Sequence, residues 1–279
     1  MRILVTGCDG QLGKAVTEEL YRRGHRVTGT GRRDMDITDR ESVGRVFHIV
    51  KPEAVIHCAA FTNVDRAEEE ETLCREVNVK GTMHVVEYCR KYQARLIFIS
   101  SDYVFSGEKE RPYREDDRRE PINVYGKSKR DGEDMVRTYE KTFVVRTSWV
   151  FGDGRNFVKA ILEKAEREPI LSVVSDQIGC PTYTKDLATL LADMVTTDRY
   201  GVYHVTNDGS CTWYEFAKEI IKQAGKSTEV RPVTTEEYPT KARRPHNSRL
   251  EKGNLEEANF LRLPGWEDAL KRYIDNFYK

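Results

Sequence analysis

The sequence predicts an α/β protein whose core is a Rossmann-type, doubly wound parallel sheet with a smaller, interleaved C-terminal substrate domain. Two observations carry this prediction. Short β-rich runs alternate with helical patterns from the first residues, and a glycine-rich turn joins the first run to the first helix. Strands and helices that alternate at this length form right-handed βαβ units, and these build a parallel sheet covered on both faces.

The elements of the first half follow from the spacing of apolar residues. Leu12, Val16 and Leu20 recur at the spacing of a helix, which Gly24 ends, and a similar stripe predicts a helix from about residue 39 to Pro52. The expected strands are 3–6, 26–31, 54–60, 96–101 and 143–150. Further helices are expected at 79–92 and 125–139, and the charged segment 107–121 between them is expected to be a mobile loop.

The alternation loosens after about residue 150, and this change divides the chain. We expect 1–150 to be a NAD(P)-binding Rossmann domain and 151–279 to be mainly a substrate-binding domain. A strand at 202–205 is expected to return to the main sheet, so that parts of 183–207 complete it. The other elements expected here are a strand at 171–175 and helices at 156–168, 185–195 and 266–277.

Charge and cysteine usage exclude several kinds of partner and site. Lys plus Arg and Asp plus Glu both total 46, and this balance gives no electrostatic case for a nucleic-acid partner. The six cysteines contain no CxxC pair and the six histidines are dispersed, so we expect reduced thiols and no metal site. No leader pattern opens the chain, and no apolar run approaches the roughly 20 residues of a membrane span. We therefore expect a cytoplasmic protein without a membrane or nucleic-acid partner.

The turn after the first strand has the form TGxxGxxG, from Thr6 to Gly13. Between a strand and a helix, Gly7 allows the tight turn, Gly10 lets the backbone approach a pyrophosphate, and Gly13 lets the helix pack closely on the strand. The phosphates then lie against N–H groups at the start of the helix. An ordinary βα turn is the alternative, but the framing by strand and helix favours a dinucleotide site.

The end of the second strand indicates which dinucleotide is bound. NAD sites usually place Asp or Glu there for the ribose 2′-hydroxyl, whereas this chain has Gly31, Arg32 and Arg33. Two guanidiniums can pair with a 2′-phosphate, so the sequence favours NADPH, with NADH possible. The alternative is that both arginines are solvated loop charges.

A YxxxK motif opens the expected helix 125–139, and its spacing puts the Tyr125 phenol and the Lys129 ammonium on one face. A tyrosine with a pKa of about 10 exchanges protons poorly at neutral pH until a cation stabilises its phenolate. The strand at 96–101 ends in Ser101, at the sheet edge where α/β proteins bind ligands. We predict an oxidoreductase in which Tyr125 is the proton donor, Lys129 supplies the charge and holds the nicotinamide ribose, and Ser101 completes the catalytic group.

A second YxxxK motif, from Tyr214 to Lys218, lacks this setting. No strand ending in a hydroxyl residue precedes it, and Trp213, Phe216 and Ile220 give its helix an apolar face. We therefore interpret the second copy as a packing helix.

The glycine turn, Ser101 and the YxxxK motif together resemble the extended short-chain dehydrogenase/reductase family, over essentially the whole chain. Within that family the chain looks most like reductases of dTDP-linked 4-keto-6-deoxy sugars. The segments that carry the match are GCDGQLG, MDITD, CAAFTNVDRAE, VNVKGT, ISSDYVFSG, NVYGKSKRDGE, RTSWVFG, DQIGCPTYTKDLA and RRPHNSRL. The last two lie in the region that distinguishes one sugar from another.

The resemblance implies binding roles for individual residues. It puts the pyrophosphate at Gly10, Gln11 and Leu12, and the adenine beside Asp36 and Ile37. The remaining cofactor contacts implied for the ribose and diphosphate are Ala59, Ala60 and Thr62. Asp36 can also be read as a residue that only starts a helix.

On the substrate side, the resemblance implies that Ser101 polarises the ketone, that Asp102 also touches the sugar, and that Trp149 packs on it. Trp149 can also be read as a core residue. The C-terminal segment must bind an anionic diphosphate, and guanidiniums match phosphate geometry. We predict Arg244 and Asn247 as substrate-binding residues, in a basic group whose other cations are Arg243 and Arg249.

Two other functions share these motifs. A nucleotide-sugar epimerase or dehydratase with bound NAD has the same turn and YxxxK, and a non-catalytic regulatory subunit could be built on the same fold. The short chain, the arginines after the second strand and the DQIGCPT segment favour a reductase, and the complete catalytic group disfavours a regulatory subunit. Some reductases of this kind use a carboxylate just after the glycine turn for a metal-assisted dimer. Lys14 and Ala15 stand here instead, so we expect a monomer or weak homodimer.

Overall fold

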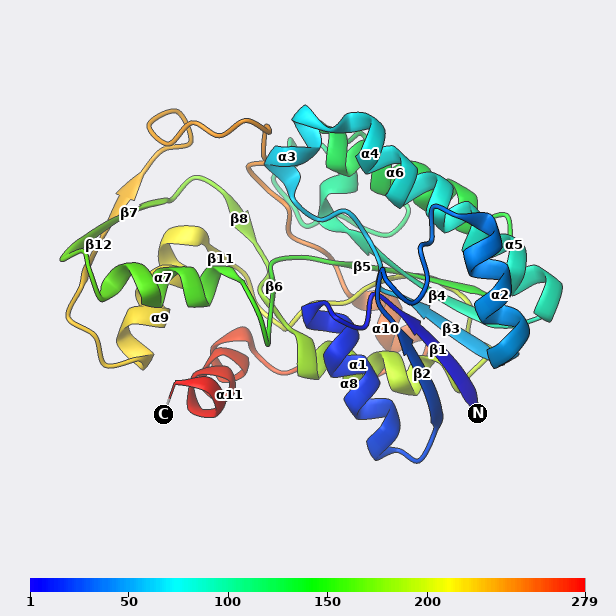
Figure 1. The fold of residues 1–279 in the computed structure, drawn as a ribbon. Coiled ribbons are helices and arrows are strands. Elements are labelled where there is room, and N and C mark those ends of the chain that lie inside the picture. The colour runs from blue at the N-terminus through cyan, green and yellow to red at the C-terminus, as the bar shows by residue number, and fades with distance from the viewer. Residues whose placement is uncertain (279) are drawn as a thin grey trace.

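The computed structural model describes residues 1–278, which form two lobes (Figure 1). The larger lobe contains a six-stranded sheet in the order β10-β5-β4-β3-β1-β2, with every pair of neighbours parallel. Its strands are β1 (Arg2–Thr6), β2 (Arg26–Thr30), β3 (Ala54–His57), β4 (Arg95–Ser101), β5 (Thr142–Thr147) and β10 (Gly201–His204). The predicted α/β class with a Rossmann-type parallel sheet is confirmed.

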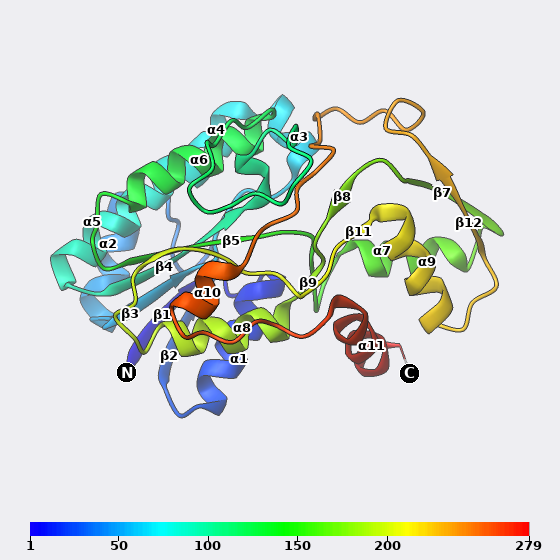
Figure 2. The same ribbon diagram turned by 180° about the vertical axis from the view of Figure 1, so that it is seen from behind.

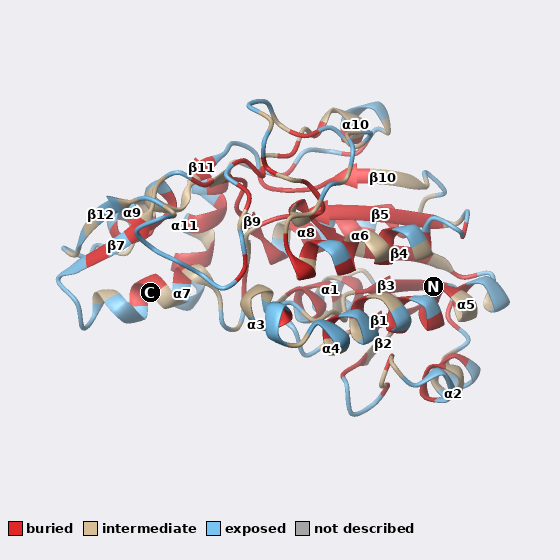
Figure 3. Cartoon of the chain, turned by 90° about the horizontal axis from the view of Figure 1, so that it is seen from above, coloured by how far each residue is buried: buried red, intermediate tan, exposed pale blue. Residues whose placement is uncertain are grey.

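Helices cover both faces of this sheet. One layer consists of α1 (Gln11–Arg22), α8 (Thr184–Met194) and α10 (Gly253–Glu257), and the other of α2 (Arg40–Val50), α5 (Thr82–Tyr92) and α6 (Val124–Val136). Successive side chains of a strand point to opposite faces, so Ile3 and Val5 join the core under α1 while Leu4 joins the core under α2. Figure 3 shows the central strands buried between the two layers.

The smaller lobe has its own apolar core, which includes Phe151, Phe216 and Tyr273. Its helices are α7 (Phe157–Ala165), α9 (Trp213–Gln223) and α11 (Trp266–Phe277). Its strands pair two by two: β7 (Ile170–Val174) with β12 (Glu229–Val233), β6 (Val150–Phe151) with β9 (Thr182–Tyr183), and β8 (Ile178–Gly179) with β11 (Cys211–Thr212). After β12 the chain returns past α3 (Val64–Glu69) to α10 of the larger lobe, as Figure 2 shows. None of the helices in residues 1–278 is both long and apolar enough to span a bilayer.

The structure differs from the expected elements at three places. The strand expected at 143–150 is interrupted because Trp149 has a φ of +46°, a left-handed conformation that no extended strand can contain. The helix expected at 79–92 begins as a π-helical turn, η1 (Glu76–Gly81), which follows α4 (Glu71–Arg75). The pairing of β12 with β7 was not foreseen, since a polar segment containing Pro232 does not read as a strand.

The segment 107–121 is not the free loop that its charge suggested. Tyr113 is buried, and its ring stacks on Phe105 with centroids 4.3 Å apart. Its backbone exchanges hydrogen bonds with two residues of the C-terminal chain: the Tyr113 nitrogen donates to the Arg249 carbonyl at 2.8 Å, and the Glu251 nitrogen donates to the Tyr113 carbonyl at 2.7 Å. A buried tyrosine therefore helps to fasten a segment that is otherwise mostly charged.

Candidate active site

A cavity of about 750 Å³ opens at the carboxyl edge of the sheet, beside the ends of β1 and β3. From β1 the sheet extends to β2 on one side and to β3 on the other, and such a reversal leaves a crevice in which α/β proteins bind ligands. The predicted site residues that line it are Gly7, Gly10, Gln11, Leu12, Gly13, Arg32, Asp36, Ile37, Ala59, Ala60, Thr62, Ser101, Asp102, Tyr125, Lys129 and Trp149. The predicted residues Arg33, Arg244 and Asn247 lie outside its lining.

The glycine turn fits a dinucleotide because its backbone leaves no room for side chains. Gly7 has a φ of +67°, and a Cβ there would lie 2.7 Å from the backbone nitrogen of Ala59. A Cβ on Gly13 would overlap the carbonyl oxygen of Gly7, so glycine is needed for α1 to pack this closely on the turn. Gly10 caps α1 without a side-chain bond, which leaves the first N–H groups of the helix for a phosphate.

The two predicted arginines have different positions at the adenosine end of the cavity. Arg32 lines the cavity, whereas Arg33 is exposed outside it. Asp36 accepts hydrogen bonds from the hydroxyl and the backbone nitrogen of Thr38, at 2.7 and 2.9 Å, and these bonds together with the Arg32 charge lower its pKa. Ile37 is buried beside them. Of the two predicted arginines, only Arg32 therefore belongs to the cavity lining.

Carboxylates that the sequence reasoning missed also reach this end. A Cβ on Gly31 would overlap Oδ2 of Asp9 and would lie 3.4 Å from Oδ2 of Asp34. Asp9 comes from the glycine turn and not from the strand tip where sequence motifs place the acid. Two carboxylates thus lie beside Gly31, which precedes Arg32 and lines the cavity.

The loop after β3, residues 58–62, lines the cavity and is fixed from two sides. The Ala59 nitrogen donates to the Thr6 hydroxyl at 3.1 Å. The Phe61 nitrogen donates to Asn78 Oδ1 at 2.8 Å, and the Asn78 amide donates back to the Phe61 carbonyl at 3.1 Å. Asn78 belongs to η1, and single π-helical turns are frequent at functional sites.

The catalytic group is assembled by β4 and α6. Asn123 starts α6 by accepting a hydrogen bond of 2.7 Å from the Gly126 nitrogen, which sets the first turn and with it Tyr125. Lys129 follows one turn later and is buried. Ser101 ends β4, and its hydroxyl donates a hydrogen bond of 2.9 Å to Asp102 Oδ1. Ser101, Tyr125 and Lys129 all line the cavity. The structure therefore brings together all three residues that the sequence predicted.

Burial sets the protonation states of this group. Burial, followed by the charge of Asp102, raises the pKa of Tyr125 well above its ordinary value, so the phenol keeps its proton at neutral pH. Burial lowers the pKa of Lys129 to about 8, with the charge of Glu133 opposing. Burial raises the pKa of Asp102 to about 7, against a hydrogen bond from Ser248. The cavity is thus lined by a protonated phenol and, one turn further along α6, by an ammonium, groups suited to protonating a carbonyl oxygen.

Aromatic rings line the cavity on the side of the smaller lobe. The Trp149 ring stacks on Trp213 with centroids 3.5 Å apart and planes 10° from parallel, and both rings line the cavity. Trp149 also packs against the core of the smaller lobe, and its contact with the sugar stays a prediction. Trp213 was missed because it had been assigned to the apolar face of the helix that carries the second YxxxK motif.

The predicted diphosphate ligands are engaged elsewhere. The Arg244 guanidinium forms an ion pair of 2.7 Å with Asp65 of α3. The buried Asn247 amide donates to the carbonyl oxygen of Arg111 at 3.0 Å, and its oxygen accepts from Arg249 Nε at 2.9 Å. Asn247 therefore fixes the segment 107–121 instead of facing the cavity.

The cations that line the cavity are Arg32, Arg66, Lys129 and Arg155. Arg66 lies on α3 and Arg155 in the loop before α7, and both are exposed. Arg243, in contrast, is exposed but outside the cavity lining. Isolated arginines in polar stretches carry no sequence signal, which is why Arg66 and Arg155 were not predicted.

The second YxxxK motif lies outside the cavity, in agreement with its interpretation as packing. Tyr214 packs against the core of the smaller lobe, and the Lys218 Nζ lies 5.4 Å from the centroid of the Tyr214 ring. In the described part of the chain, no three His, Cys, Asp or Glu side chains gather as a possible metal site.

The whole chain is similar to proteins of known family. A family model described as the RmlD substrate binding domain matches residues 1–279. The spore coat polysaccharide biosynthesis protein SpsK of Bacillus subtilis (strain 168) is 42% identical over 275 residues, which cover 98% of this chain and 96% of that protein. The dTDP-4-dehydrorhamnose reductase of Aggregatibacter actinomycetemcomitans is 39% identical, with 97% of each chain covered.

A solved structure agrees with these relatives. The crystal structure of dTDP-4-dehydrorhamnose reductase from Bacillus anthracis, in complex with NADP, matches with a TM-score of 0.96 and 40% identity, over 99% of both chains. The motifs, the cavity and the full-length matches all indicate one family. The chain belongs to the RmlD family and is a nucleotide-sugar reductase of that family, with a Rossmann fold that binds NAD(P).

Proposed function

We propose that this protein reduces the C4 ketone of dTDP-6-deoxy-L-lyxo-4-hexulose (dTDP-4-dehydrorhamnose) to give dTDP-L-rhamnose, with NADPH as the reductant and NADH possible. The observation that carries the proposal is that one cavity holds Ser101, Tyr125 and Lys129 between a dinucleotide turn and an aromatic wall. The Aggregatibacter relative is named for this reaction, and the Bacillus anthracis structure holds NADP, which supports the substrate and cofactor proposed.

The residues present fit the cofactor. Gly7 and Gly13 shape a cradle that any side chain would fill, the start of α1 offers N–H groups to the pyrophosphate, and Arg32 offers a guanidinium to a 2′-phosphate. NADPH, when bound, would supply the hydride. We expect Lys129 to hold the nicotinamide ribose, and its position in the same cavity as the turn supports this role.

The protein's own residues handle the proton. The ketone carbon gains the hydride, and Tyr125 gives its phenolic proton to the ketone oxygen, which becomes the C4 hydroxyl. The Lys129 ammonium stabilises the phenolate that remains, and the Ser101 hydroxyl hydrogen-bonds the ketone oxygen and polarises it. Because burial raises the pKa of Tyr125, the phenol keeps the proton that it donates to the substrate.

The sugar is held by groups at the other end of the cavity. Trp149 and Trp213 offer an apolar surface to the 6-deoxy methyl group, and Asp102 adjoins Ser101 beside the ring hydroxyls. Arg155 and Arg66 are the cavity-lining cations that we expect to meet the substrate's diphosphate, although Arg66 also pairs with Glu70 at 2.8 Å. The identity of the sugar rests on the relatives, because none of these contacts distinguishes one 4-keto sugar from another.

A substrate panel tests the proposal. Purified protein is mixed with NADPH and, in parallel, with dTDP-, UDP- and GDP-linked 4-keto-6-deoxy sugars, and both NADPH loss and the sugar product are measured. We expect one NADPH oxidised per dTDP-L-rhamnose formed. Ready reduction of the UDP or GDP compound with none of the dTDP compound would contradict the substrate. Product formed without NADPH loss would indicate an epimerase or dehydratase.

A further inference from the structure

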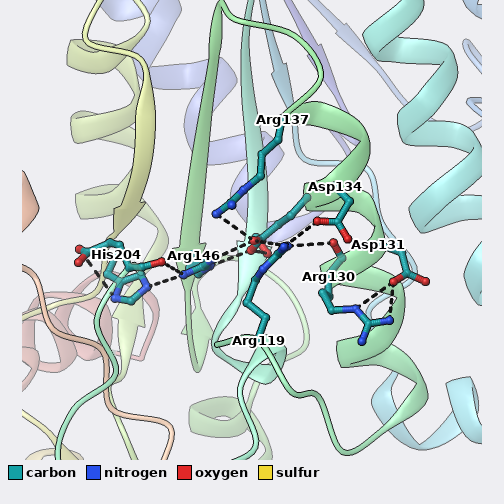
Figure 4. A network of polar contacts seen from close by, with 10 residues as sticks. Arg119, Arg130, Asp131, Asp134, Arg137, Arg146 and His204 are labelled. Atoms are coloured by element: carbon teal, nitrogen blue, oxygen red, sulfur yellow. Dashed lines mark hydrogen bonds and ion pairs between the residues drawn. The ribbon is translucent and has the colours of Figure 1, made fainter. Parts of the chain in front are cut away.

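A buried ion pair lies one helical turn beyond the catalytic lysine. Glu133 of α6 and Arg146 of β5 are both 0% exposed, and two hydrogen bonds of 2.8 Å join the guanidinium to the two carboxylate oxygens. Arg119 adds a third bond to the carboxylate at 3.2 Å, and Arg137 lies 3.9 Å away. Figure 4 shows the side chains of these three arginines converging.

Glu133 connects α6 to both neighbouring strands, to β5 through Arg146 and to β4 through Ser100. Ser100, which precedes Ser101 on β4, donates a hydrogen bond of 2.6 Å to Glu133 Oε1. Arg146 is the direct neighbour of Ser100 in the register of β4 and β5. Glu133 follows Lys129 by four residues, so both lie on the same face of α6. The carboxylate therefore links the end of β4 to the helix that carries the acid and the lysine.

Stability alone does not account for charges at this place. Removing two charges from water costs about as much as their attraction returns, and apolar replacements of buried pairs are often neutral or stabilising. Burial alone would raise the pKa of Glu133, but the hydrogen bonds and charge of Arg146 hold that pKa below its ordinary value. The structure thus maintains an ionised carboxylate inside the protein, close to the catalytic group.

In the described part of the chain, Glu133 is the only counter-charge of Lys129. The Lys129 Nζ lies 4.3 Å from the centroid of the Phe98 ring. The titratable groups that interact with its charge are Glu133 on its own helix, Cys74 of α4, Cys58 after β3 and His57 of β3. Burial raises the pKa of both thiols and lowers the pKa of His57 to about 3, so these three groups are neutral at pH 7. Glu133 therefore supplies the negative charge that opposes loss of the lysine's proton.

From this geometry we infer that Glu133 is a positioning residue for the reduction. Its pair with Arg146 and its bond from Ser100 hold α6 against β4, and its charge keeps Lys129 an ammonium ion. The inference rests on the proposed function, in which Lys129 acts in its charged form.

Removing the pair as a unit tests this without leaving an unpaired charge in the core. In the double variant Glu133→Gln/Arg146→Gln we expect kcat at pH 7 to fall about tenfold, because a small displacement of the acid is costly. The alkaline limb of the pH profile, set by the Lys129 pKa of about 8, should move down by about one pH unit. The direction follows because Glu133 raises the Lys129 pKa whereas Arg146 is not among the groups that shift it, so the loss of the carboxylate outweighs the loss of the guanidinium.

Two single variants serve as controls. Asp134 neighbours Glu133 on α6 and also pairs with Arg119, at 2.7 Å, but its side chain is 47% exposed. Asp134→Asn should leave kcat and the alkaline limb unchanged. Ser100→Ala removes the bond to Glu133 but keeps its charge, so kcat should fall several-fold while the limb stays in place.

A second readout needs no substrate. The Lys129 amino group is titrated by NMR in 13C-lysine-labelled protein, with its resonance assigned from Lys129→Arg, in wild type and in the double variant. A Lys129 pKa that is lower by about one unit in the double variant supports the inference, whether or not a keto sugar is turned over. Absence of turnover with every keto sugar would contradict only the proposed function. A folded double variant, checked by circular dichroism, with wild-type kcat and an unchanged Lys129 pKa would overturn the inference.

Discussion

The chain carries the same YxxxK pattern on two helices, and only α6 places it in a site. On α6 the lysine is 2% exposed and lines a cavity together with Ser101 and the glycine turn. On α9 the lysine is exposed and lies over the ring of its own tyrosine. The spacing of the motif is identical, so the difference must come from what surrounds each helix.

The two helices differ in what precedes them. Before α6, β4 brings a hydroxyl to the carboxyl edge of the sheet, where the strand order reverses and a cavity forms. Before α9, the two-residue strand β11 leads directly into a capping box between Thr212 and Glu215. This capping box stabilises the start of the helix. A YxxxK motif acquires a lowered lysine pKa and a partner hydroxyl only where the fold removes water and supplies a ligand edge.

The largest difference between the two motifs is expected for their tyrosines. Tyr125→Phe removes the proton donor and should lower kcat by about 10²–10⁴-fold, with cofactor affinity nearly unchanged. Tyr214→Phe removes a hydroxyl outside the cavity and should leave kcat near wild type. Steady-state kinetics on both variants check this, and more than about a tenth of wild-type activity in Tyr125→Phe would rule out its role as the acid.

The lysines should differ next, in their response to pH. Because the Lys129 pKa is about 8 and only the ammonium stabilises a phenolate, activity should be complete below that pH and fall as pH rises through it. Lys129→Met should lower kcat about 100-fold and abolish this alkaline limb. Lys218→Met should leave kcat and the alkaline limb unchanged. A limb near pH 8 that survives in Lys129→Met would show that another group titrates there.

A smaller effect is expected for the cofactor, again between two similar residues. Arg32→Ala should raise KM for NADPH about 10- to 100-fold, as expected for a lost charge-assisted bond, with little change for NADH. Arg33→Ala should change the KM values for NADPH and NADH by less than about twofold, because Arg33 lies outside the cavity lining. Equal effects of Arg32→Ala on the two cofactors would show that this arginine does not read a 2′-phosphate.

The smallest effect concerns Trp213, which directly precedes the second YxxxK motif, Tyr214 to Lys218. Trp213→Ala removes the ring stacked on Trp149 and should raise KM for the sugar nucleotide about 2- to 10-fold, with kcat little changed. Tyr214→Ala, at the next position, is the matched control and should not raise this KM. A fall in kcat with KM unchanged would mean that the stack serves the chemistry and not sugar binding.

The sequence predicted the parts of this protein that depend on local pattern. The glycine turn, the alternation of strands and helices, and the Tyr125–Lys129 spacing each involve residues a few positions apart, and the structure has them as expected. The sequence did not predict contacts between segments that are distant along the chain. Arg244 pairs with Asp65, 179 residues away, and Asp9 reaches the end of β2 from the glycine turn. Neither contact leaves a mark in the local sequence.

The fate of a labelled hydride tests the central claim most directly. Wild-type protein and Tyr125→Phe are supplied with the dTDP-linked 4-keto-6-deoxy sugar and with NADPH carrying deuterium on either face of nicotinamide C4. The account predicts that one of the two labelled cofactors delivers its deuterium to C4 of dTDP-L-rhamnose with wild type, and that Tyr125→Phe forms almost no product. A wild-type product without deuterium at C4 from either cofactor, or equal product from Tyr125→Phe, would contradict it.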